Sequence, residues 1–153
     1  MPTMTATTMT IDDITETFAL LDDWEERYRY VIEIGKSLPV LQPEQRNEIN
    51  RVKGCASNVW LVTHVGAGAD PIITFEGESD AHIVKGLVAV TLAFYSGKTA
   101  SRIIAEDAFE LFRTLGFEQH LTPQRSNGVR SMIERIRRDA RQALAAAQAA
   151  PGG

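Results

Sequence analysis

Residues 58–75 read NVWLVTHVGAGADPIITF, and they decide the fold class. Residues 58–65 are rich in β-branched and aromatic side chains, and residues 66–71 combine glycine, aspartate and proline, which is typical of a turn. The β-rich pattern resumes at residues 72–75. The stretch predicts an antiparallel hairpin, with residues 51–52 as candidates for a short third strand beside it.

Helical periodicity begins directly after the hairpin. Apolar residues recur at helical spacing over residues 83–95 and cover most sides of the predicted helix, which indicates a buried central helix. Ser79 or Asp80 is expected to cap its N-terminus, and Gly97 its C-terminus.

Helical periodicity also precedes the hairpin. Apolar residues recur every three or four positions from Ile14 to Leu38, and Pro39 ends the pattern. Thr10 with Asp13 forms a candidate capping pair at the start. A short helix is expected from Pro43, because proline is favoured in a first turn.

Three more helices are expected after the central one. Thr99 is placed to cap a short helix, residues 109–115 form another, and a long helix follows Pro123 with its arginines facing outward. Helices on either side of one small antiparallel sheet predict an α+β fold. We expect a single domain over residues 11–145, with tails at residues 1–10 and 146–153.

Composition excludes several classes of protein. The chain has 153 residues, 44% of them hydrophobic and 24% charged, which is ordinary for one folded domain. The net charge of -4 does not suit a protein that coats nucleic acid. The longest apolar stretch, residues 86–95, is too short to cross a membrane. Residues 123–141 hold six arginines against Glu134 and Asp139, which indicates either a solvated helix face or a basic face for an acidic protein partner.

Cys55 is the only cysteine, so the chain forms no internal disulfide, and a reducing compartment, by default the cytoplasm, is expected. Residues 1–10 contain no lysine, arginine or apolar core and do not resemble a signal peptide. Gly54 and small neighbours leave the sulfur reachable, while Arg51 and Lys53 would favour the reactive thiolate. The alternative is an inert buried cysteine.

Metal and hydrolase chemistry find little support in the sequence. The soft ligands lie in separate segments without the paired spacing of a zinc or iron–sulfur site: Cys55, His64, His82 and His120. No metal and no cofactor are therefore expected. A Cys–His hydrolase would pair Cys55 with one of the histidines, and the sequence cannot show whether any of them is close enough. His64 is expected to face solvent from its strand.

Four motifs in one order resemble the SufE family of sulfur-acceptor proteins, and the resemblance covers residues 21–140. The motifs are WEERY at 24–28 with IG at 34–35 and LP at 38–39, VKGCASNVW at 52–60, SDAHIVKGL at 79–87, and HLTPQRSNG at 120–128. The resemblance implies an α+β fold similar to that of IscU scaffold proteins, without their set of metal ligands. One departure is Ala56, where many family members carry glutamine.

The resemblance also implies a function. Family members accept sulfur from a cysteine desulfurase that uses pyridoxal phosphate (of the SufS or CsdA kind), stimulate it, and pass the sulfur to an iron–sulfur scaffold, so neither nucleic acid nor a membrane is an expected partner. The acceptor maps onto Cys55, and the chain is then a carrier rather than an enzyme. The supporting or partner-binding positions map onto Gly54, Ser57, Asp80, His120 and Arg125.

A persulfide on the acceptor would need protection from reductants and oxidants. We therefore expect the loop around Cys55 to rest against apolar surface, where burial raises the thiol pKa, and to swing outward at Gly54 when a partner docks. The alternative function is an iron–sulfur or metal-binding scaffold with further ligands.

Overall fold

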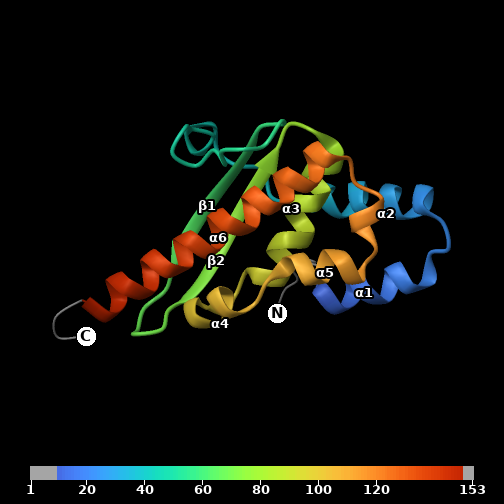
Figure 1. Cartoon of the computed structure of the whole chain (residues 1–153). Coiled ribbons are helices and arrows are strands. Elements are labelled where there is room, and N and C mark those ends of the chain that lie inside the picture. The colour runs from blue at the N-terminus through green and yellow to red at the C-terminus, as the bar shows by residue number, and fades with distance from the viewer. Residues whose placement is uncertain (1–9, 150–153) are drawn as a thin grey trace, which may run out of the picture.

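The hairpin expected from residues 58–75 forms one side of the structure, a computed structural model that describes residues 10–149 (Figure 1). Strands β1 (Val59–Val65) and β2 (Ile72–Ser79) pair antiparallel, with Leu61 opposite Gly77. β2 is longer than predicted, because the EGES segment continues the ladder to Val59. Within residues 10–149 the sheet is accompanied by six α-helices, so the predicted α+β class is confirmed.

The third strand is not where the sequence placed it. Strand β3 (Lys98–Thr99) pairs with β2 and gives the order β1-β2-β3. Arg51 makes only an isolated bridge to Trp60 on the opposite edge. The pairing ends after Val52, because Gly54 turns the chain away at a φ of 90°. The Arg51 carbonyl points away from β1 and accepts from Arg135 of the last helix at 3.3 Å.

One face of the sheet is covered by two helices, α3 (His82–Tyr95) and α6 (Pro123–Ala149) (Figure 1). A Cβ added to Gly77 would touch Val88 and Leu92 of α3, and the Thr63 hydroxyl donates to Asp139 of α6 at 2.8 Å. The strand residues that face these helices are buried: Val59, Leu61, Ile73 and Phe75. The core therefore lies between this face and α3, which is buried on most sides as predicted.

Helix α2 (Trp24–Lys36) packs on the far side of α3. A Cβ added to Gly35 would stand 2.7 Å from the Gly86 nitrogen, so the two glycines permit this close approach of the helices. The sequence predicted uninterrupted helical periodicity from Ile14 to Leu38, and the structure contradicts this at one point. Helix α1 (Ile11–Leu20) ends before α2 begins, since the Asp23 carboxylate accepts from the Glu26 N–H at 2.8 Å and caps a new helix.

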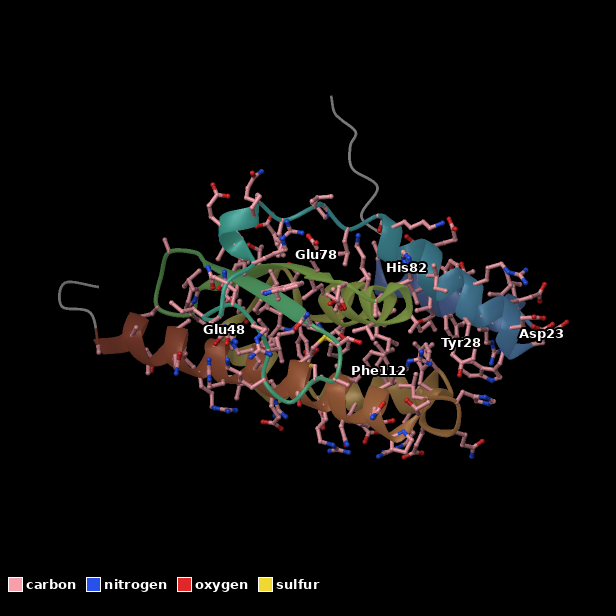
Figure 2. All side chains as sticks on the ribbon, turned by 90° about the horizontal axis from the view of Figure 1, so that it is seen from above. Asp23, Tyr28, Glu48, Glu78, His82 and Phe112 are labelled. Carbon is pink, nitrogen blue, oxygen red and sulfur yellow. The ribbon has the colours of Figure 1, made fainter. Side chains whose placement is uncertain are left out.

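Short elements complete the described chain: η1 (Pro43–Gln45), α4 (Ala100–Ala105), α5 (Ala108–Thr114) and η2 (Phe117–Gln119). The capping pair at the start of α1 is confirmed, and Thr99 caps α4 as predicted. The predicted cap of α3 is wrong, because its N-cap residue is Ala81, which makes no side-chain capping bond. Glu78, labelled in Figure 2, accepts from Leu41 N–H and Arg46 and so fastens the η1 segment to β2.

Helix α6 departs from prediction in two arginines. Arg135 is 13% exposed in its side chain, and Arg137 donates to the Ile104 carbonyl at 2.6 Å, so both turn inward rather than outward. The helix continues to Ala149, while residues 1–9 and 150–153 of the two expected tails lie outside the described residues. The domain boundaries stay a prediction. No helix among residues 10–149 has the length and apolarity to cross a bilayer.

Candidate functional site

The Cys55 loop, residues 53–58, lies between the Arg51 bridge and β1 and rests on α6. Gly54 turns it with a φ of 90°, a conformation that glycine adopts at little cost. A Cβ at Gly54 would stand 2.6 Å from the Ser131 Oγ of α6. Glycine is therefore needed twice, for the turn and for the close contact with the helix.

The Cys55 side chain is half-buried and points to the second turn of α6. Its Sγ lies 3.6 Å from the Gly128 carbonyl oxygen and donates a weak hydrogen bond to it. A hollow of about 220 Å³ adjoins the sulfur, with space for more than one water-sized group. Its apolar walls come from α3 and α6: Val84, Leu87, Val129 and Met132.

Burial raises the pKa of the Cys55 thiol above its ordinary value, and the positive charge of Arg51 opposes that rise only in part. The expectation that Arg51 favours the thiolate is thus confirmed, while burial has the larger effect. Lys53, expected to act likewise, points to Glu48 (labelled in Figure 2), with 2.9 Å between its Nζ and the carboxylate. The resting thiol is consequently protonated at neutral pH.

Asp80 holds the end of the Cys55 loop. Its carboxylate accepts from the Asn58 N–H at 3.2 Å and from the Asn58 side-chain amide at 2.8 Å, and its own N–H donates to the Asn58 carbonyl at 3.3 Å. These contacts explain why Asp80 does not cap α3. The residue lies near the loop, as the resemblance implies, but acts on Asn58 rather than on the sulfur.

Ser57 and Arg125 line the same hollow as Cys55. Arg125 lies in the first turn of α6, where its main-chain N–H donates to the Thr122 hydroxyl at 3.2 Å. Four of the candidate positions are therefore brought together at one place: Gly54, Cys55, Ser57 and Arg125.

His120 is placed elsewhere. Its ring stacks on Trp24, with 4.0 Å between the ring centroids and 17° between the planes. The same indole packs edge-on against buried Phe117. His120 is not among the residues that line the hollow, so the structure gives it a packing contact, and its expected role in partner binding stays a prediction.

Gly128 is the residue whose part in the site the sequence did not reveal, although it stands in the quoted HLTPQRSNG motif. It is buried, and a Cβ there would lie 3.7 Å from the Cys55 Sγ. A glycine inside an otherwise arginine-rich helix is the available signal, since glycine in a helix interior usually marks a close approach.

None of the three histidines lines the hollow beside Cys55, whose sulfur instead contacts the Gly128 carbonyl oxygen. His64 projects from the outer face of β1, and its Nε2 lies 2.9 Å from Glu76. Among residues 10–149, no three His, Cys, Asp or Glu side chains converge to hold a metal ion.

Comparisons with known proteins agree with this geometry. The model of the SufE family, described as an Fe-S metabolism associated domain, matches residues 12–140. An uncharacterized SufE-like protein of Rhizobium etli is 59% identical over 137 residues, which are 89% of this chain and 93% of that protein. One from Rhizobium meliloti is 56% identical over 137 residues, 89% of this chain and 98% of its own length.

A solved structure supports the fold alone. The solution structure of a hypothetical protein from Thermus thermophilus superposes with a TM-score of 0.68 at 20% identity. The match covers 90% of this chain and 99% of that one. The expected fold is thereby confirmed.

Proposed function

The chain belongs to the SufE family and thus has a role in Fe–S metabolism, and on that premise we propose that Cys55 accepts sulfur from a cysteine desulfurase that uses pyridoxal phosphate. The sulfur then passes from Cys55 to an iron–sulfur scaffold. The observation that carries the proposal is the half-buried thiol of the only cysteine, set in a glycine-turned loop beside an apolar hollow.

The transfer is a thiol–disulfide exchange in its chemistry. Cys55 loses its proton to solvent, and the thiolate attacks the outer sulfur of the persulfide on the desulfurase. A new S–S bond forms on Cys55 while the S–S bond of the desulfurase breaks. The inner sulfur leaves as a thiolate that takes up a proton. The sulfane sulfur keeps its oxidation state, so no further oxidant or reductant is consumed.

The hollow suits the product of this exchange. A persulfide extends the side chain by one sulfur, and about 220 Å³ of largely apolar space adjoins the Cys55 Sγ. The apolar side chains on its walls, from Val84, Leu87, Val129 and Met132, would partly shield the persulfide from the dissolved thiols that reduce it. Because the exposed Gly54 turns the loop, we also propose that docking swings Cys55 outward at this residue.

Intact-mass measurement tests the sulfur transfer. The wild-type protein, incubated with a purified cysteine desulfurase, pyridoxal phosphate and L-cysteine, should gain the mass of one or more sulfur atoms. Cys55→Ser should gain none and should also fail to stimulate the desulfurase. Equal mass gains on the two proteins would refute the assignment of Cys55.

Hydrogen exchange tests the movement of the loop. Residues 51–58 should change their amide protection when the desulfurase is added, and equal protection with and without it contradicts the swing. The alternative function, an iron–sulfur or metal-binding scaffold, requires ligands in addition to Cys55. Reconstitution with iron and sulfide followed by an absorption spectrum tests it, because a stable coloured cluster on the isolated chain would favour the scaffold.

A further inference from the structure

A second hollow lies on the other side of the Cys55 loop, between the loop and the exposed flank of α6. Its volume is about 400 Å³. We call it the basic groove, because five of the eight residues that line it carry positive charge and one carries negative charge: Val52, Lys53, Arg130, Ser131, Glu134, Arg135, Arg138 and Arg141.

Arg135 builds the floor of the basic groove. Its guanidinium donates to the main-chain oxygens of Ile49 at 2.8 Å and Arg51 at 3.3 Å, and it pairs with Asp139 at 3.3 Å. The Asp139 carboxylate is held in turn by the Thr63 hydroxyl. These bonds fix the segment that leads into the Cys55 loop, residues 49–51, against α6, so the floor of the groove is a preformed feature of the fold.

The remaining cations stand at the rim and face solvent. Arg138 is 55% exposed and makes only a long contact of 3.5 Å to Asp139, and Arg141 one turn further on is exposed as well. Lys53 is 66% exposed and shares Glu48 with Arg51. Because Lys53 is already paired with Glu48, the charges of Arg138 and Arg141 are the ones most available to an anionic partner.

The basic groove and the thiol hollow are lined by different residues, but both adjoin the Cys55 segment and α6. Lys53 lines the groove and stands two residues before Cys55, while Ser131 lines the groove from α6 and meets Gly54 of the loop. Any protein that reaches the Cys55 sulfur must cover the surface next to this loop. The positive rim is thus placed where it guides the approach of a protein that exchanges sulfur with Cys55.

We propose that the basic groove docks an acidic segment of the desulfurase that delivers sulfur to Cys55, an inference that rests on the proposed function. Carboxylates on a partner complement the arginines of the rim and raise the rate of productive encounter. A protein partner is favoured over nucleic acid, since the net charge of the chain is -4 and the positive side chains form one short groove.

Charge reversal at the rim tests the inference. The double variant Arg138→Glu/Arg141→Glu should bind a purified cysteine desulfurase at least about ten-fold more weakly than the wild type at low salt, mainly through slower association. Added salt should weaken the wild type towards the variant. The matched control is Arg29→Glu/Arg102→Glu, which changes the net charge equally at exposed sites on α2 and α4 and should bind as the wild type does.

The measurements separate this inference from the proposed function. At a saturating concentration of desulfurase, the Arg138→Glu/Arg141→Glu variant should still gain sulfur on Cys55, because its thiol is intact. If even the wild type gains no sulfur, the proposed function fails, whatever the binding data show.

Two results would reject the docking role of the basic groove and leave the proposed function intact. One is wild-type affinity of the Arg138→Glu/Arg141→Glu variant for the desulfurase while the wild type accepts sulfur normally. The other is equal weakening in the Arg29→Glu/Arg102→Glu control, which would trace the effect to net charge. Binding of a short duplex DNA that is lost on reversal at the rim, with desulfurase binding unchanged, would assign the groove to nucleic acid and reject the acidic segment.

Discussion

The Cys55 Sγ lies 3.6 Å from the Gly128 main-chain oxygen, and this contact favours the protonated thiol. A thiol donates to a carbonyl oxygen, whereas a thiolate would face the negative end of the carbonyl dipole. Burial acts in the same direction and raises the thiol pKa. The resting position therefore keeps the nucleophile inactive, and reaction requires that Cys55 leave this contact.

The first prediction concerns the pH dependence of Cys55 reactivity. The rate of alkylation by iodoacetamide should rise with pH, with a midpoint above the thiol's ordinary pKa of 9.0, because burial and the Gly128 contact both disfavour the thiolate. Mass spectrometry of quenched samples measures the rate. The same protein unfolded in urea serves as the reference, and a folded midpoint at or below the unfolded one contradicts the prediction.

The same pKa shift must appear in stability. Between the thiol pKa of the unfolded chain and the higher one of the folded chain, the unfolded state loses its proton while the folded state keeps it. The free energy of unfolding of the wild type should therefore fall relative to Cys55→Ser as the pH rises through this window. Below the window the difference between the two proteins should be constant with pH.

The second prediction isolates the charge of Arg51. Its guanidinium lowers the Cys55 pKa, so Arg51→Gln should move the midpoint of alkylation to higher pH and slow the reaction at pH 8. Lys53→Gln is the matched control, since both cations pair with Glu48 but only the charge of Arg51 lowers the thiol pKa, and its midpoint should stay with the wild type. An equal shift in both variants would mean that general charge, rather than the Arg51 position, matters.

Local signals in the sequence predicted most of the elements correctly. The turn after β1, the capping pair of Thr10 and Asp13 and the cap at Thr99 all depend on residues within a few positions of each other. The Cys55 loop was also identifiable, because Gly54 and its small neighbours mark a turn before a strand. Turns and helix caps depend on residues that are close together in the sequence, so they can be predicted from the sequence alone.

Two of the errors, at Asp80 and at Arg135, have a long-range cause. Asp80 is a good helix cap by its position, but its carboxylate is occupied by Asn58, 22 residues earlier. Arg135 sits at an ordinary surface position of an arginine-rich helix and yet reaches carbonyls 84 and 86 residues away. Which partner a carboxylate or a guanidinium finds depends on the segments that the fold brings together, so the sequence alone does not reveal these hydrogen bonds.

The third prediction concerns the hold of Asp80 on the Cys55 loop. Asp80→Ala removes both acceptors from Asn58 and should speed alkylation of Cys55 several-fold, because the loop opens more often. The free energy of unfolding should drop by about 1 kcal/mol. Hydrogen exchange over residues 51–58 should show lower protection.

Asp70→Ala provides the comparison for Asp80→Ala. Its carboxylate likewise accepts from a main-chain N–H and a side chain, both of Ser101, far from the Cys55 loop. Asp70→Ala should lower the free energy of unfolding by a similar amount and leave the rate of Cys55 alkylation unchanged. If both variants speed alkylation equally, the effect is global loosening, and the specific role of Asp80 is wrong.

The fourth prediction separates the two reasons for glycine at position 54. Gly54→Ala places a side chain at a φ of 90° and sets its Cβ 2.6 Å from the Ser131 Oγ. Gly68→Ala imposes a similar backbone strain at a φ of 100°, with no atom within 4 Å of the added Cβ. Backbone strain alone costs about 1–2 kcal/mol, so Gly68→Ala should lose that much and Gly54→Ala should lose more.

Removing the neighbouring hydroxyl should recover only the steric part of the Gly54→Ala cost. In the double variant Gly54→Ala/Ser131→Ala the Oγ is absent. Its loss of stability relative to Ser131→Ala, measured by urea unfolding, should approach the loss that Gly68→Ala shows relative to the wild type. If the double variant is no more stable than Gly54→Ala, then the loop does not press on α6 at this point, and the proposed hinge at Gly54 would lack the helix against which it closes.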